Sequence, residues 1–260
     1  MRFMLASASQ LLAMVWRAAA VLVVLVLVRG MLGPLNTAFL LGVGLVLVLL
    51  VNGLLPHLAA AHLRTDKFCA PPPATAEVVR QLAEPLGVDV DVRLSVAEPL
   101  NAAFVSTGNC AGILVVGSGL VGDDLRAAVA HELGHCVAND SERNQGARAV
   151  ELLAAYGVVT LALYLTFAPA LSVLTLGLLG VRSVAAARHR VVELEADRFA
   201  LSLVGPEPLD ALITRLEDHG YGCPRPGIVP ELLATHPLAT QRRYLVAQAR
   251  ARLHRGSSPA

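Results

Sequence analysis

Charged residues are scarce in this chain, and their charges nearly cancel. Asp, Glu, Lys and Arg make up 16% of the 260 residues, and the formal net charge at pH 7 is +1. A nucleic-acid-binding domain needs an excess of Lys and Arg to neutralise phosphates, so we predict no nucleic-acid partner. Five arginines near the end of the sequence are a local exception, which we expect to be solvated near an anionic lipid leaflet: Arg242, Arg243, Arg250, Arg252 and Arg255.

Cysteine is scarce too, and its spacing excludes two kinds of site. The four cysteines, at positions 69, 110, 136 and 223, form no CxxC pair. A disulfide framework or a cysteine-ligated zinc site would need paired cysteines. We expect reduced thiols, and we expect Cys136 to be a small buried residue rather than a metal ligand.

Hydrophobic residues, in contrast, make up 55% of the chain, which is typical of a membrane protein with a modest polar domain. The first apolar stretch, Leu11–Val28, has the length of a signal peptide, but no small-residue cleavage site follows it. The second, Leu35–Leu55, has no charge and is long enough for a membrane span. Arg29–Pro34 between them predicts a tight turn. Residues 1–56 should therefore form a transmembrane hairpin, followed by a Pro-rich linker over residues 57–74.

A third apolar stretch, Ala149–Val181, contains one charged residue, Glu151. It is too long for one membrane span and short for two. Pro169 lies near its middle and predicts a break or a kink in the helix.

The polar sequence before this stretch contains His131-Glu132-Leu133-Gly134-His135, an HExxH motif. Helical spacing puts both histidines on one face, so both imidazoles can bind one metal ion, and Glu132 can reach a water on that metal. The preceding residues 123–130 predict a helix with an Asp cap. The plainer alternative is a surface helix with two solvated histidines. The motif favours a zinc peptidase in which Glu132 is the general base.

A catalytic zinc ion usually has three protein ligands and one open position for water. Residues 188–200 predict a helix in which Glu193 and Asp197 share one face. We predict Glu193 as the third ligand, with Glu195 as the alternative. Asp197 can accept a hydrogen bond from a ligating histidine. The plainer alternative here is a solvated, charged helix face.

The segment before the motif predicts a small sheet. Thr75–Leu86 reads as an amphipathic helix and Val88–Leu94 as an alternating strand. Ala102–Val105 and Ile113–Val116 predict two more strands, joined by a turn over Thr107–Asn109. An edge of such a sheet can receive an extended peptide by strand addition, although it can also be scaffold alone.

These motifs occur together in one known family. HELGH, the later ExxxD of residues 193–197, Thr235-His236-Pro237 and Arg242 resemble the HtpX-like membrane zinc metalloproteases, which are related to the CAAX prenyl-protein endopeptidases. Asn101-Ala102-Ala103-Phe104 is similar to the family's Asn-Ala-Phe strand, with one extra alanine. The resemblance covers residues 75–246, together with the N-terminal hairpin.

The resemblance implies an α-helical multi-pass membrane protein with an α+β catalytic domain of the zincin (gluzincin) type, built from a small β-sheet and the HExxH helix. It implies one Zn2+ per chain, bound by His131, His135 and Glu193. It further implies substrate contacts by residues 101–104. It also implies that Glu132 is the general base and that His236 donates a hydrogen bond to the oxyanion. Asp197 and Arg242 would support the ligands.

If those three ligands bind one metal ion, both ends of the third apolar stretch lie on the same side of the membrane. We therefore predict a hairpin or re-entrant segment over residues 149–182, turning near Thr166–Ala170, between catalytic parts at 75–148 and 183–260. On the side of the membrane opposite the catalytic parts, this topology places one basic residue, Arg29. The side that holds the catalytic parts carries Arg2, Arg64, Lys67, Arg148, Arg182, Arg188 and Arg190. The positive-inside rule then predicts a cell-membrane protein with its active site facing the cytoplasm.

The resulting prediction is a membrane-embedded zinc endopeptidase that cleaves protein or peptide substrates, such as unfolded or membrane proteins, in membrane protein quality control. One alternative is a regulatory membrane protease with a dedicated partner, which the short far-side loops argue against. Another is a non-catalytic zinc-binding scaffold, which Glu132 and the open fourth zinc position argue against. The resemblance also allows prenyl-protein processing, but the enzymes that carry it out have far more membrane spans than this chain. No motif indicates the oligomeric state or the cleavage preference.

Overall fold

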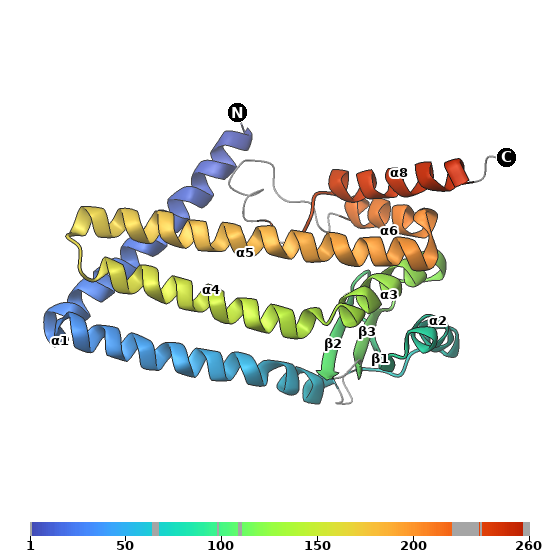
Figure 1. Ribbon diagram of the computed structural model, residues 1–260, viewed down its shortest axis with the longest axis horizontal. Helices are drawn as coiled ribbons and strands as arrows, with labels where there is room; N and C mark the ends of the chain where they lie inside the picture. Colours follow the sequence, from blue (N-terminus) through green and yellow to red (C-terminus); the bar gives the residue numbers. More distant parts are fainter. Residues whose placement is uncertain are drawn as a thin grey trace. The chain divides into compact units, whose positions relative to one another are not determined.

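The computed structural model describes residues 2–63, 68–97, 99–108, 111–219, 234 and 236–256. Within these residues the protein is mostly helical, with one small mixed sheet (Figure 1). The chain divides into two compact units.

The first unit comprises residues 1–53, 144–189 and 224–235 and contains most of the apolar sequence. Its first element is α1 (Arg2–Leu63), a long helix with one non-helical residue, Gly33, at φ +77°. Glycine adopts this φ without strain, and the following Pro34 disfavours helical geometry at the residue before it. The turn predicted over Arg29–Pro34 is therefore a kink at one residue rather than a loop.

The third apolar stretch forms two helices, α4 (Asp140–Ala162) and α5 (Phe167–Val204), which pack side by side within this unit (Figure 1). They approach closely at Gly177, where an added Cβ would lie 2.7 Å from Val158 Cγ1. The turn between them begins before the predicted Thr166–Ala170. Pro169 lies in the first turn of α5, where its missing N–H needs no partner, so it does not break the helix.

Polar contacts of the described residues join α1 to this pair of helices. Arg29 Nη1 donates to the carbonyl of Leu165 at 3.4 Å, in the turn between α4 and α5. The Tyr156 hydroxyl donates to the carbonyl of Ala38 at 3.2 Å.

Two helices of the described residues are long and apolar enough to cross a membrane, Val26–Leu63 and Ala168–Val204. The helix α4 is not one of them. Helices of this kind also occur as signal sequences and in soluble cores, so the predicted multi-pass arrangement stays a prediction.

The second unit comprises residues 54–143, 190–223 and 236–260 and contains the sheet. Its strands are β1 (Asp89–Ser95), β2 (Ala102–Gly108) and β3 (Ala111–Gly117), in the order β1-β3-β2. β1 runs parallel to β3 and β2 runs antiparallel to it, so β2 is an edge strand. All three predicted strands are confirmed, whereas Asn109 of the predicted turn lies outside the described residues.

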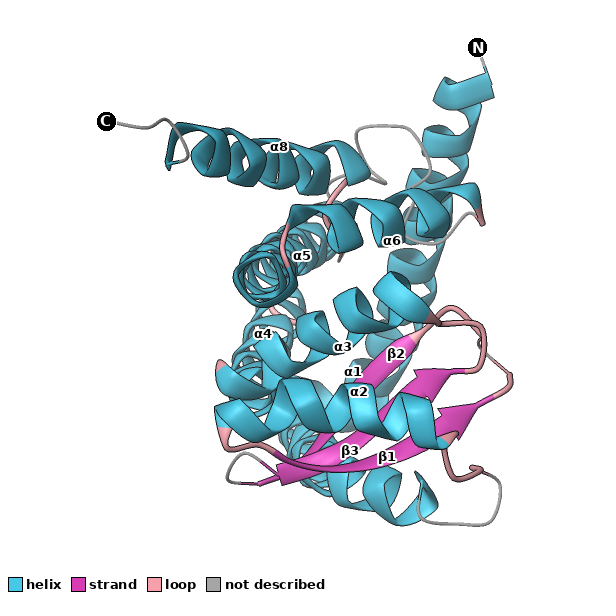
Figure 2. Cartoon of the chain, turned by 90° about the vertical axis from the view of Figure 1, so that its right-hand side faces the viewer, coloured by secondary structure: helices cyan, strands magenta, loops and turns pink. Residues whose placement is uncertain are grey.

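Two helices cover one face of this sheet, α2 (Pro73–Ala83) and α3 (Gly122–Val137) (Figure 2). A single turn of 3-10 helix, η1 (Glu84–Leu86), extends α2. The linker predicted over residues 57–74 is shorter than expected, because α1 continues to Leu63, and its residues 64–67 lie outside the described part. The core between sheet and helices includes Val79, Leu82, Leu114, Val116, Val129 and Leu133.

The predicted Asp cap of α3 is wrong. The helix begins one residue earlier than expected, after Val121, and has no side-chain cap. Asp123 and Asp124 instead lie in its first turn, where a carboxylate interacts favourably with the helix dipole. Asp124 also pairs with Arg215 of α6 (Pro206–Asp218), which fastens α6 to the start of α3.

The last helix, α8 (Ala239–Gly256), packs on α6. Arg250 lies 3.0 Å from Asp210 and 3.4 Å from Glu207, and Arg243 pairs with Glu217. These arginines of the basic C-terminal sequence therefore bind acidic residues of the protein itself.

Candidate metal centre

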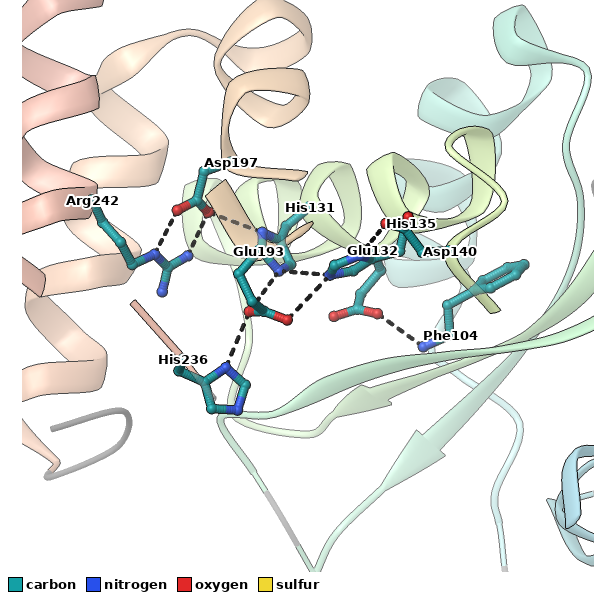
Figure 3. Close-up of polar contacts among 9 residues, drawn as sticks. All are labelled: Phe104, His131, Glu132, His135, Asp140, Glu193, Asp197, His236 and Arg242. Atoms are coloured by element: carbon teal, nitrogen blue, oxygen red, sulfur yellow. Dashed lines mark hydrogen bonds and ion pairs between the residues drawn. The ribbon is translucent and has the colours of Figure 1, made fainter. Parts of the chain in front are cut away.

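The two motif histidines converge on one face of α3. His131 and His135 lie one turn apart, with their rings edge to face and their Nε2 atoms 3.2 Å apart (Figure 3). Both side chains are partly buried. This is the arrangement expected from the spacing of the motif.

Glu193 of α5 completes the cluster. Its Oε2 lies 3.7 Å from His131 Nε2, and its Oε1 lies 3.6 Å from His135 Nε2. In the described residues these three side chains form the one group able to hold a metal ion, with donor atoms within 4.8 Å of one another. Glu195, the alternative ligand, is absent from that group and lies 3.8 Å from Arg143 instead.

Glycine at position 134 permits this approach of α5 to α3. A Cβ added there would lie 3.1 Å from the Cα of Ala196 and 3.2 Å from the Cβ of Phe199. Any larger side chain would separate the helix that carries the histidines from the helix that carries Glu193.

A buried carboxylate lies behind each histidine. Asp197 Oδ1 is 2.9 Å from His131 Nδ1, and Asp140 Oδ2 is 2.9 Å from His135 Nδ1. An ionised carboxylate only accepts hydrogen bonds, so each ring carries its proton on Nδ1 and presents the lone pair of Nε2 to the cluster. Asp197 in turn accepts hydrogen bonds from Nε and Nη2 of Arg242, each at 2.7 Å.

These contacts produce a site that favours a cation. Two Nε2 lone pairs and the Glu193 carboxylate face one another at close range. Burial alone would lower the pKa of His131, but its contacts with Asp197 and Glu193 outweigh burial and raise the pKa to about 10. The same negative surroundings that raise this pKa would favour a metal cation at the cluster.

The donor set fits zinc. With Zn–N distances of 2.0–2.1 Å and tetrahedral geometry, two ligating nitrogens lie about 3.3 Å apart. The two Nε2 atoms are 3.2 Å apart here. Two histidines and one glutamate, with a fourth position for water, are also a ligand set used by catalytic zinc.

Glu132 is oriented by the edge of the sheet. Its Oε2 accepts a hydrogen bond from the backbone N–H of Phe104 in β2, at 2.9 Å (Figure 3). Burial raises the pKa of this carboxyl group. Asn101 directly precedes β2, and Ala102 and Ala103 pair with β3, so the residues predicted to bind substrate lie on the strand that contacts Glu132.

His236 lies beside the predicted ligand Glu193. Its Nδ1 is 3.1 Å from Glu193 Oε2, and its side chain is 65% exposed. The hydrogen bond to Glu193 raises the pKa of His236. Thr235 of the same sequence motif lies outside the described residues.

One residue of the site was missed in the sequence. Asp140 follows His135 by five residues, whereas the acidic partner predicted for a histidine lies in the later helix, at Asp197. Spacing alone does not indicate its role, because helical geometry is interrupted at Asn139, between α3 and α4. An acidic residue at the start of the next helix was the available signal.

Comparisons with known proteins agree with this geometry. Residues 75–249 match the family model described as peptidase family M48. The crystal structure of S. mikatae Ste24p matches the fold with a TM-score of 0.58 at 16% identity. That match covers 94% of this chain and 64% of the Ste24p chain, so the protein spans less than two thirds of that relative. No curated protein matches the chain significantly.

Proposed function

Because this chain belongs to peptidase family M48, we propose that it is a membrane zinc endopeptidase. The observation that carries the proposal is the convergence of His131, His135 and Glu193 with Glu132 beside them. One zinc ion per chain is expected. When bound, zinc would supply a Lewis acid that acidifies water and polarises a carbonyl group.

The chain's own residues supply the proton transfers. Glu132 would take the proton of the attacking water and later give it to the leaving amine. Its raised pKa suits this exchange, because a carboxylate that is too weak a base would not accept the proton. His236, next to Glu193, would donate a hydrogen bond to the oxyanion of the scissile carbonyl.

The substrate would lie along β2. The carbonyl of Asn101 accepts a hydrogen bond from Gly117 of β3 at 2.8 Å. In an antiparallel pair, residues that hydrogen-bond to the partner strand alternate with residues whose backbone N–H and C=O groups point away from it. The backbone groups of Ala102 and Phe104 therefore face away from β3. The N–H of Phe104 does so and reaches Glu132. A peptide added to this edge would therefore lie beside the general base.

Association with a bilayer is supported by the apolar surface of α1. Leu35 and Phe39 are 75% and 69% exposed, on a helix long enough to cross a membrane. We propose that α4 and α5 form a membrane hairpin or re-entrant segment, that the active site faces the cytoplasm, and that unfolded or membrane proteins are cleaved in quality control. The division into an N-terminal hairpin, two catalytic parts and the intervening apolar segment is part of this proposal.

Removal and return of the metal would test the proposal. Casein cleavage by the detergent-purified protein should stop when a chelator removes zinc and resume when one equivalent of zinc is restored. His135→Ala should bind no stoichiometric zinc and should stay inactive after zinc is added. Cleavage that continues in the chelated protein would contradict the assignment.

A further inference from the structure

Asp140 is a buried carboxylate to which the proposed reaction gives no role. Its side chain is 3% exposed, and its Oδ2 lies 2.9 Å from His135 Nδ1. Its other described contact is with Arg143, at 3.3 Å from Oδ1. Arg143 is 54% exposed, and an ion pair with so exposed a partner contributes little. A carboxylate is costly to bury without strong partners, so the contact with His135 is its main compensation.

The two carboxylates behind the histidines are held in different ways. Asp197 is fixed by two hydrogen bonds from Arg242. Asp140 is held by the short turn that joins α3 to α4. At this junction Asn139 has a positive φ of 54°, and its N–H donates to the carbonyl of Cys136 at 2.9 Å. This turn places Asp140, the first residue of α4, against His135.

We propose that Asp140 is the positioning residue for His135. It holds the ring in the orientation and tautomer that leave Nε2 available to zinc, and it thereby makes zinc affinity depend on the α3–α4 junction. This inference rests on the proposed zinc site. A metal-ligating histidine whose other nitrogen loses its carboxylate partner typically loses about 10- to 100-fold in metal affinity.

Zinc affinity, measured by competition with a chromogenic chelator on the detergent-purified protein, tests the proposal without relying on proteolysis. Asp140→Ala should bind zinc about 10- to 100-fold more weakly than wild type. Asp140→Asn should fall between them, because the amide oxygen still accepts from Nδ1–H but carries no charge. Glu142→Gln is the matched control, since it neutralises a carboxylate in the same helical turn that contacts Asn139 instead, and it should bind zinc like wild type.

The melting temperature of the zinc-free protein separates positioning from a structural role. Asp140→Asn should leave it close to that of wild type while zinc affinity falls. Wild-type zinc affinity in Asp140→Ala would overturn the proposal. An Asp140→Asn variant that binds zinc no more tightly than Asp140→Ala would also overturn it. If Asp140→Ala does not fold, the isosteric Asn variant decides, and wild-type affinity in it would overturn the proposal. If His135→Ala binds zinc as tightly as wild type, the zinc site itself is wrong and this inference falls with it.

Discussion

At the scale of single residues, the chemistry of this site depends on which nitrogen of each histidine faces an acid. Asp197 and Asp140 occupy the Nδ1 atoms, and Glu193 faces the Nε2 atoms. The same residues in another tautomer would present an N–H to the metal position. The acidic partners of the histidines therefore support the proposed zinc site, and such a partner typically contributes about 10- to 100-fold in metal affinity.

His236 offers a prediction at this scale. Because it is exposed and contacts Glu193 but is not a ligand, His236→Ala should retain zinc, while loss of an oxyanion donor should reduce kcat by about 10²- to 10³-fold. Steady-state cleavage and metal content, measured on one preparation, would test this. His219→Ala, which removes an exposed histidine bonded to Arg215 in α6, is the control and should behave like wild type. An unchanged kcat, or loss of zinc, would contradict the assigned role.

The residues of the site were not equally predictable from the sequence. The histidines and Glu132 follow from helical spacing, and Glu193 and Asp197 follow from a second pair of acids at helical spacing. His236 and Arg242 depended on the resemblance to a family, because nothing in their spacing indicates that they contact Glu193 and Asp197. Asp140 was harder to predict, since an acidic residue at the start of the next helix does not by itself indicate that its carboxylate is buried against His135.

At the scale of elements, the site is assembled by the close packing of α3 against the second half of α5. Gly134 makes that packing possible, and the edge strand β2 brings Phe104 to Glu132. Alternating apolar residues predicted β1, and two short apolar runs predicted β2 and β3. The order β1-β3-β2 could not be predicted, because it depends on how the strands pack with α2 and α3 rather than on local sequence.

Gly134→Ala should therefore weaken both the fold and the zinc site. The new methyl group would meet the Ala196 backbone at 3.1 Å, and such overpacking typically costs about 1 to 3 kcal/mol. Denaturant unfolding and chelator competition would measure the two effects. Gly146→Ala in α4 is the matched control, because a Cβ there meets nothing within 4 Å, and it should not destabilise the protein. Equal behaviour of the two variants would contradict the account of the α3–α5 contact.

At the scale of the whole molecule, the ligands bracket the apolar segment in sequence. His131 and His135 precede residues 144–189, and Glu193 follows them. A segment that crossed the membrane once would separate the ligands, so the proposed topology follows from the ligand cluster. Composition predicted apolar helices, but the tight turn expected over Arg29–Pro34 is a kink at Gly33, and the turn expected near Thr166–Ala170 begins earlier in the chain.

Cysteine labelling would test this topology. In a variant lacking the native cysteines, Tyr164→Cys in the turn between α4 and α5 and Val121→Cys before α3 would each be treated with an impermeant maleimide in sealed vesicles. Both native side chains are exposed, at 57% and 64%. Two crossings predict reaction from opposite sides of the membrane, with Val121→Cys on the cytoplasmic side. Reaction of both from one side would contradict two crossings and leave a re-entrant segment.

The central claim, a zinc endopeptidase with Glu132 as its base, is tested most directly by comparing purified wild type with Glu132→Gln. Bound zinc and casein cleavage would be measured in parallel on each protein. The account predicts one zinc ion in both and cleavage by wild type alone, because the amide cannot accept the proton from water. Undiminished cleavage by Glu132→Gln, or no zinc in either protein, would contradict it.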